Sequence, residues 1–98
     1  MQIYEVIWKE QFALKIQSKH RITLEEVEEI LFTKSIFRKA AKGRVRGEDL
    51  FAAYGQTESG KYLIIFFIYK FNKAALPITT RQMTLSERRY YEKRKKAH

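Results

Sequence analysis

The sequence predicts an α+β fold, with an antiparallel sheet of about four strands and helices packed on one face, in the order β-α-α-β-β-β-α. Two observations lead to this prediction. Residues 61–71 form a long, almost continuously apolar run, which is typical of a central strand. Thr23 and Glu26 have the spacing of a capping box, which marks the start of a helix. The 98 residues are enough for one small domain.

The first third of the chain is expected to hold one strand and two helices. Residues 3–8 are rich in β-branched and aromatic side chains and predict a strand. Apolar residues at helical spacing predict a helix over residues 10–19. A second helix is expected over residues 24–32, where an apolar stripe follows the capping box. Its glutamates suit the positive end of the helix dipole.

The middle of the chain predicts a β-hairpin. Residues 49–57 have the composition of a strand, and residues 58–60 supply turn chemistry, with Gly60 able to adopt a positive φ. The long apolar run then returns as the partner strand. Before the hairpin, residues 33–47 have a weak pattern, which predicts a loop that is functional or that contains a short strand at 36–38.

The last part of the chain predicts a strand followed by a basic helix. Residues 76–80 form the strand, and Pro77 favours a position at the sheet edge or near the strand start, because proline has no N–H to donate. Thr84 or Ser86 is expected to cap the final helix, which is expected to fray from residue 93 onward. Arg81 therefore falls at the junction between sheet and helix.

The charge of the chain indicates a polyanion or an acidic protein as its partner. The net charge is +9 and the sequence pI is about 9.9. Cations concentrate in residues 34–46 and again in residues 88–96, whereas glutamates gather in residues 25–29. The terminal cations read either as a solvated tail or as a nonspecific phosphate contact.

Several classes of protein are excluded by composition. The sequence has no cysteine, only two histidines and no glycine-rich phosphate loop, so no disulfide framework, metal site or bound cofactor is expected. No apolar run approaches the roughly 18–20 residues that span a bilayer. The N-terminus lacks the features of a secretory signal. We therefore expect a cytoplasmic protein without membrane association.

Motifs in a fixed order along most of the chain carry a family resemblance. They are Trp8, Lys19-His20, Thr23-Leu24-Glu25-Glu26, Glu48-Asp49-Leu50-Phe51-Ala52-Ala53-Tyr54-Gly55, Gly60-Lys61, Ile78-Thr79-Thr80-Arg81 and Glu87-Arg88-Arg89-Tyr90. With these motifs the chain resembles the BrnT-like toxins of bacterial type II toxin–antitoxin pairs, whose fold is similar to that of RelE-type ribonucleases. It departs from the family pattern at Lys9, Phe12, Arg21 and Leu50.

The resemblance implies a ribonuclease that cleaves RNA by metal-independent attack of a ribose 2′-OH. It also implies a cognate antitoxin, acidic where it binds the toxin, and operator DNA bound through the antitoxin complex. The catalytic candidates are His20 as base or acid, Glu48 as a second base, and Arg81 as a bidentate phosphate ligand. The RNA-binding candidates are Lys19, Arg44, Arg46, Lys61, Arg88, Arg89 and Tyr90.

Each candidate also has a structural interpretation. Arg81 can tie the last helix to the sheet through a salt bridge, and His20 can cap the end of a short helix. Lys61 can be a solvated hairpin lysine, and Glu48 can relieve repulsion beside a basic loop. If these readings hold, the chain is a non-catalytic module of the same fold that binds RNA, DNA or protein. A subunit whose basic faces serve only an acidic partner is a third alternative.

Overall fold

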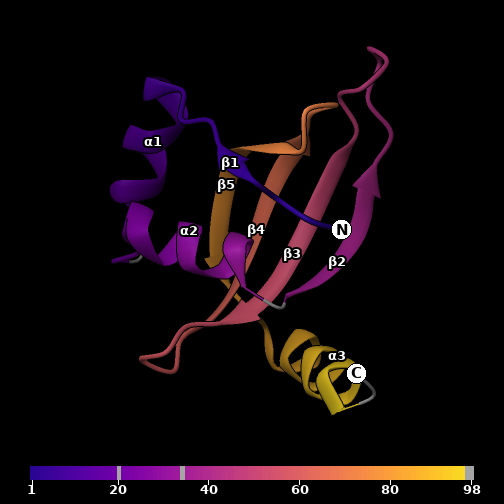
Figure 1. Ribbon diagram of the computed structural model, residues 1–98. Coiled ribbons are helices and arrows are strands. Elements are labelled where there is room, and N and C mark those ends of the chain that lie inside the picture. Colours follow the sequence, from indigo (N-terminus) through magenta and orange to yellow (C-terminus); the bar gives the residue numbers. More distant parts are fainter. Residues whose placement is uncertain (20, 34, 97–98) are drawn as a thin grey trace.

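The computed structural model describes residues 1–19, 21–33 and 35–96. Its elements are β1 (Glu5–Val6), α1 (Glu10–Gln17), α2 (Leu24–Phe32), β2 (Ile36–Ala41), β3 (Leu50–Gln56), β4 (Tyr62–Tyr69), β5 (Ala74–Gln82) and α3 (Leu85–Lys96). The strands of this described part form one sheet in the order β1-β5-β4-β3-β2, antiparallel except where β1 meets β5 (Figure 1). The expected α+β fold is confirmed.

β4 explains the long apolar run, because it lies between β3 and β5 and its side chains are buried or half-buried on both faces. Its side chains alternate between two clusters. Leu63, Ile65 and Phe67 are fully buried on the face that we call the first face, beneath α1 and α2. Ile64 and Phe66 lie on the opposite, second face. A strand buried on both sides needs apolar residues at every position, so it shows no alternation.

The first face is closed by α2, which begins as the capping box predicts. Thr23 Oγ1 accepts from the Glu26 N–H at 3.1 Å, and a Glu26 carboxylate oxygen accepts from the Thr23 N–H at 2.9 Å. The helix lies close to β3 at Gly55, where an added Cβ would come within 2.8 Å of Ile30. Glycine at position 55 therefore permits the close approach of helix and strand.

The last helix lies on the second face. Thr84 and Glu87 form another capping box, with Thr84 Oγ1 accepting from the Glu87 N–H and Glu87 accepting from the Thr84 N–H. Tyr91 is buried against Tyr62, with ring centroids 6.0 Å apart. Helices on one face were expected, and α1 and α2 follow that expectation. α3 differs, because it lies at one end of the sheet (Figure 1). There Tyr90 and Tyr91 pack against the apolar side chains of the second face.

Two segments differ from expectation in length. The strand expected over residues 3–8 is reduced to β1, which pairs only with Ala74 and Ala75. In contrast, the weak segment 33–47 contains a full strand, β2. It is held by pairing with β3 and by the Phe37 ring, which packs edge-on against Phe67. Most β2 side chains are exposed at the sheet edge, which explains the weak apolar pattern.

The ends of the last two elements also need correction. Pro77 does not lie on an edge strand, since β5 has β1 on one side and β4 on the other. Because β1 stops pairing at Ala75, Pro77 has no strand neighbour on that side, and the β4 pairing shifts register between Phe66 and Phe67. A proline is tolerated at such a place. α3 continues to Lys96 instead of fraying from residue 93. None of the described helices is long and apolar enough to cross a membrane.

Candidate nucleic-acid interface

Arg81 joins the end of β5 to the start of α3. Its Nη1 and Nη2 atoms donate to the two carboxylate oxygens of Glu87, at 2.7 and 2.9 Å. This hydrogen-bonded contact with Arg81 lowers the pKa of Glu87 from 4.5 to about 2, against the opposing effect of burial. The structural interpretation of Arg81 as a tie between sheet and helix is therefore confirmed. The Arg81 side chain nevertheless remains 42% exposed.

Arginines stack on aromatic rings around this junction. The guanidinium carbons of Arg38 and Arg94 lie 4.9 and 5.2 Å from the Tyr90 ring centroid. Arg88 lies 4.1 Å from the centroid of Tyr62. The arginines that meet on the second face, together with one buried and two half-buried tyrosines beneath them, form what we call the arginine–tyrosine cluster: Arg38, Tyr54, Tyr62, Arg81, Arg88, Tyr90 and Arg94.

Strand alternation and the position of α3 bring this cluster together. Arg38 on β2 is paired with Ala52, and Tyr54 comes two residues later on β3, so both side chains point to the second face. Arg81 is paired with Ile64 and points the same way. α3 then lays Tyr90 against Tyr54, with ring centroids 5.2 Å apart. Residues from four strands and a helix thus contribute to one surface.

The cluster carries uncompensated positive charge. In the described part of the chain, Arg38, Arg88 and Arg94 have no carboxylate within ion-pair distance. A guanidinium stacked on a ring is held in orientation, while its N–H groups at the edge stay available to a phosphate. The exposed guanidinium planes also offer flat surfaces on which unstacked bases can stack. This combination of groups can bind a nucleic-acid strand.

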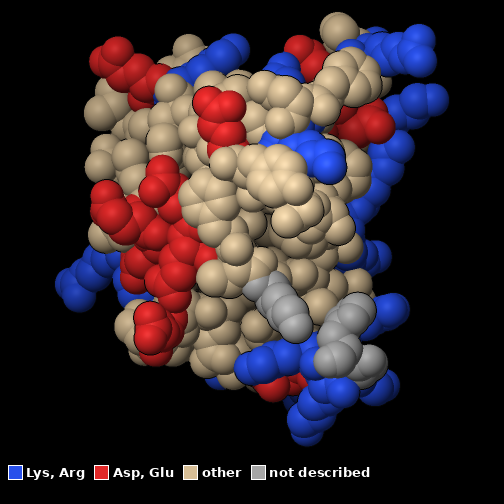
Figure 2. Space-filling view, viewed as in Figure 1, with Lys and Arg blue, Asp and Glu red and all other residues tan. Residues whose placement is uncertain are grey.

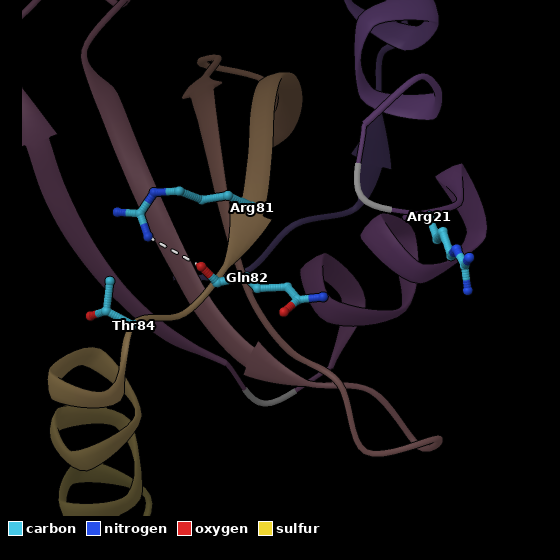
Figure 3. A pocket seen from close by; sticks show the side chains of 4 residues that line it. All are labelled: Arg21, Arg81, Gln82 and Thr84. Carbon is cyan, nitrogen blue, oxygen red and sulfur yellow. Dashed lines mark hydrogen bonds between the residues drawn. The ribbon is translucent and has the colours of Figure 1, made fainter.

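A shallow depression lies beside the cluster at the free edge of β5 (Figure 3). It is lined by Arg21, Arg81, Gln82 and Thr84. Arg81 and Gln82 extend to opposite sides of the strand, and Arg21 lies on the side of Gln82, at the corner between α1 and α2 (Figure 3). Arg81 therefore borders both this depression and the second face.

Lys61 lies on the first-face side of the sheet and belongs to the cap of α2. Its Nζ donates to Glu26 at 2.9 Å and to the Arg21 carbonyl at 2.9 Å. Burial alone would raise the pKa of Glu26, but the hydrogen bonds from Lys61 and Thr23 outweigh it and lower that pKa. Lys61 is therefore not a solvated hairpin lysine. Its charge is largely compensated by Glu26.

Glu48, Arg44 and Arg46 lie at the other end of the sheet, in the β2–β3 loop. Glu48 accepts from Lys70 Nζ at 3.3 Å. Arg81 is level with Ile64 on β4, whereas Glu48 precedes Leu50, which is level with Ile68. Ile68 is four residues from Ile64, and Glu48 is two residues further along the sheet than Leu50. The resulting separation of six strand residues corresponds to about 20 Å. Glu48 and Arg81 were both predicted as catalytic residues, and the structure corrects this prediction, because it places them at opposite ends of the sheet.

The remaining predicted residues are distributed as follows. Arg88 and Tyr90 join Arg81 in the cluster. Arg89 is exposed on α3, and Lys19 is exposed just after α1, at the corner that also holds Arg21. His20 lies outside the described residues, so its role stays a prediction.

Sequence reasoning missed Arg38, Tyr54, Tyr62 and Arg94 as members of the site. A signal for two of them was present, since Arg38 and Tyr54 occupy strand positions that face the same side once the hairpin register is known. Tyr62 and Arg94 gave no such signal, because their position depends on which face of the sheet α3 covers.

Charge is distributed unevenly over the molecule. Acidic side chains gather over α2, at the left of Figure 2, and lysines and arginines border the side of β2 and the end with α3. The acidic residues are Glu25, Glu26, Glu28 and Glu29. Among the residues that the structure describes, no three histidine, aspartate or glutamate side chains gather where they could hold a metal ion. No protein-family model and no curated protein sequence matches the chain.

Proposed function

We propose that this protein binds RNA on its second face, through the arginine–tyrosine cluster. The observation that carries the proposal is the stacking of Arg38 and Arg94 on Tyr90 and of Arg88 on Tyr62, without carboxylate partners among the described residues. The cations supply affinity for the phosphate backbone, and their guanidinium planes, which the rings hold in place, favour unstacked bases over duplex.

We further propose that the bound RNA is cleaved, and that the protein is a ribonuclease toxin neutralised by an antitoxin. The BrnT-like motifs support this activity, and the α+β fold agrees with the RelE-like architecture that the resemblance implies. The antitoxin would be acidic where it covers the cluster, and operator DNA would be bound through the complex of both proteins.

In the proposed reaction the ribose 2′-oxygen attacks the neighbouring phosphorus and the bond from phosphorus to the 5′-oxygen breaks. The 2′-OH proton passes to a base, the 5′-oxygen receives a proton, and a 2′,3′-cyclic phosphate remains. Arg81 stabilises the charge on the phosphate. To bind Arg81, the phosphate oxygens replace the carboxylate of Glu87. His20 stays the candidate base or acid. Glu48 takes no part, because it lies about 20 Å from Arg81 along the sheet.

The experiment compares binding and cleavage of a labelled single-stranded RNA by the purified protein. Arg81→Ala and Glu87→Gln both remove the same ion pair, and the amide oxygen in Glu87→Gln can still accept from the Thr84 N–H. Arg81→Ala is expected to abolish cleavage. Glu87→Gln frees the guanidinium and is expected to retain or increase cleavage. Lys15→Gln on α1 serves as the control for loss of one exposed positive charge.

The outcomes separate the candidate functions. Equal losses in Arg81→Ala and Glu87→Gln would mean that the pair matters only for folding. Cleavage that survives both Arg81→Ala and His20→Ala would reject these residues as catalytic. RNA binding without cleavage by any variant would favour a non-catalytic module. Absence of RNA binding at every salt concentration would favour a subunit that serves an acidic protein.

A further inference from the structure

An exposed aromatic ring lies at the end of the sheet opposite α3. Phe71, in the turn between β4 and β5, is 83% exposed, more than any other large apolar side chain in the described residues. A single exposed apolar side chain is ordinary in a folded protein. The significance of Phe71 depends on how the ring is held and on what surrounds it.

The neighbouring β2–β3 loop holds the ring in place. A Cβ added to Gly47 would lie 2.5 Å from a Phe71 ring carbon, so one side of the ring rests against the loop backbone. Gly47 has a φ of +83°, which favours glycine for a second reason. The ion pair between Lys70 and Glu48 joins the same turn to the same loop. The ring is thus supported on one side and open on the other.

Exposed cations lie in the same loop as Gly47. Lys42, Arg44 and Arg46 are exposed in the β2–β3 loop and have no ion-pair partner in the described part of the chain. The acids of this region are already used, because Glu48 pairs with Lys70 and Asp49 pairs with Lys39 at 2.9 Å. We call this surface the loop tip; it consists of Lys42, Arg44, Arg46, Gly47 and Phe71.

We propose that the loop tip is a second contact for single-stranded RNA, in which Phe71 stacks on a base and Arg44 and Arg46 bind the flanking phosphates. The inference rests on the proposed RNA binding and extends it along the sheet. Arg81 is paired with Ile64 on β4. Phe71 follows Ile64 by seven residues, which corresponds to about 23 Å along an extended chain. A single RNA molecule would therefore contact the arginine–tyrosine cluster and the loop tip at the same time.

The chemistry selects single strands. In a duplex the bases already stack on one another, so the open side of Phe71 would find no free base. In a single strand each base has a free face, and stacking of this kind tolerates any sequence. Removing such a contact by alanine substitution weakens binding about 5- to 150-fold.

Fluorescence titration with a single-stranded RNA that carries 2-aminopurine tests the proposal. Phe71→Ala is expected to weaken binding about 10-fold and to reduce the change in 2-aminopurine emission, whereas Phe71→Trp retains both. Phe32→Ala is the matched control, because Phe32 is 51% exposed at the end of the acidic α2. Thermal melting checks that the variants fold as the parent does.

The cations are tested through the salt dependence of binding. The double variant Arg44→Gln/Arg46→Gln is expected to reduce the slope of log affinity against log salt by about 1.4, which corresponds to two phosphate contacts on a single strand. Phe71→Ala is expected to leave that slope unchanged, because stacking releases no counterions.

Three outcomes would overturn the inference. If Phe71→Ala binds RNA like the parent while Arg38→Gln binds weakly, the cluster is the interface and the loop tip is not. If the parent binds no RNA at low salt, the proposed function itself fails. If Phe71→Ala loses binding to anionic lipid vesicles but keeps its RNA affinity, the loop tip is a membrane-surface contact.

Discussion

Arg81 and Glu87 form a two-point ion pair, and the same Glu87 carboxylate accepts a hydrogen bond from the Thr84 N–H. One carboxylate thus begins α3 and fixes it to the end of β5. The Thr84–Glu87 capping box and the ion pair together set where the helix leaves the sheet, and so which side chains of α3 face Tyr54 and Tyr62. The arginine–tyrosine cluster depends on that direction.

Stability should fall in acid because of Glu87. Its pKa is lowered from 4.5 to about 2 in the folded protein, so the stabilisation is present above pH 4.5 and is lost as the pH falls toward 2. After allowance for solvent screening we expect a contribution of about 1–2 kcal/mol. Urea denaturation of the parent and of Glu87→Gln across this range measures it. The difference in the free energy of unfolding between the two proteins should shrink as the pH falls from 4.5 through about 2, and a constant difference would contradict the linkage.

Lys61 should affect stability more than RNA binding. Lys61→Met removes the ion pair with Glu26 and the hydrogen bond to the Arg21 carbonyl, with an expected loss of about 1 kcal/mol or less. Urea denaturation measures this loss, and filter binding measures the RNA affinity. Lys15→Met is the control for the loss of one lysine charge, since Lys15 is exposed on α1, outside both proposed RNA contacts. A large fall in RNA affinity with unchanged stability would instead indicate that Lys61 contacts RNA.

Substitutions of Arg38 should separate the contribution of its charge to RNA binding from the contribution of its stacking on Tyr90. Arg38→Gln removes both and is expected to lower the salt slope of single-stranded RNA binding by about 0.7. Arg38→Lys keeps the charge and the slope, but it loses the planar group that lies 4.9 Å from the Tyr90 centroid, so affinity should still fall. Lys15→Gln on α1 should leave the slope near that of the parent. Equal affinity of parent and Arg38→Lys would show that stacking is unimportant.

Gly55 should be sensitive to any larger side chain. A Cβ there would lie 2.8 Å from an Ile30 methyl and 2.9 Å from the Ser35 hydroxyl oxygen, so Gly55→Val must push α2 away from β3. Overpacking of this kind costs about 1–3 kcal/mol. Gly60→Val is a useful comparison, because no atom lies within 4 Å of its Cβ position and its cost comes from the φ of +101° alone. Thermal or urea denaturation compares the two variants.

Signals between neighbouring residues predicted α2 well. The features that were missed depend on contacts between residues far apart in the sequence. The capping box and apolar stripe of α2 are encoded within a few neighbouring residues, and its bounds agree with the expected residues 24–32. β2 gave only a weak signal, because an edge strand with exposed side chains needs no apolar pattern. Arg81 was recognised, but its partner Glu87 was not, although the spacing from Thr84 marks a capping box.

The arginine–tyrosine cluster could not be derived from order along the chain. Arg38 and Tyr90 are far apart in sequence and meet only because α3 crosses to the second face. In the same way, no sequence pattern placed Glu48 away from Arg81. That separation follows from the register of β3, β4 and β5, which a single sequence does not reveal.

The glutamates of α2 and the cations beside β2 and α3 lie on different sides of the molecule (Figure 2). A body charged in this way has a permanent electric dipole, and a polyanion nearby exerts a torque on it. The protein would turn its basic side toward such a partner during approach, before any side chain touches. Raising the ionic strength shortens the range of that torque to a few ångströms, so more collisions would then occur in unproductive orientations.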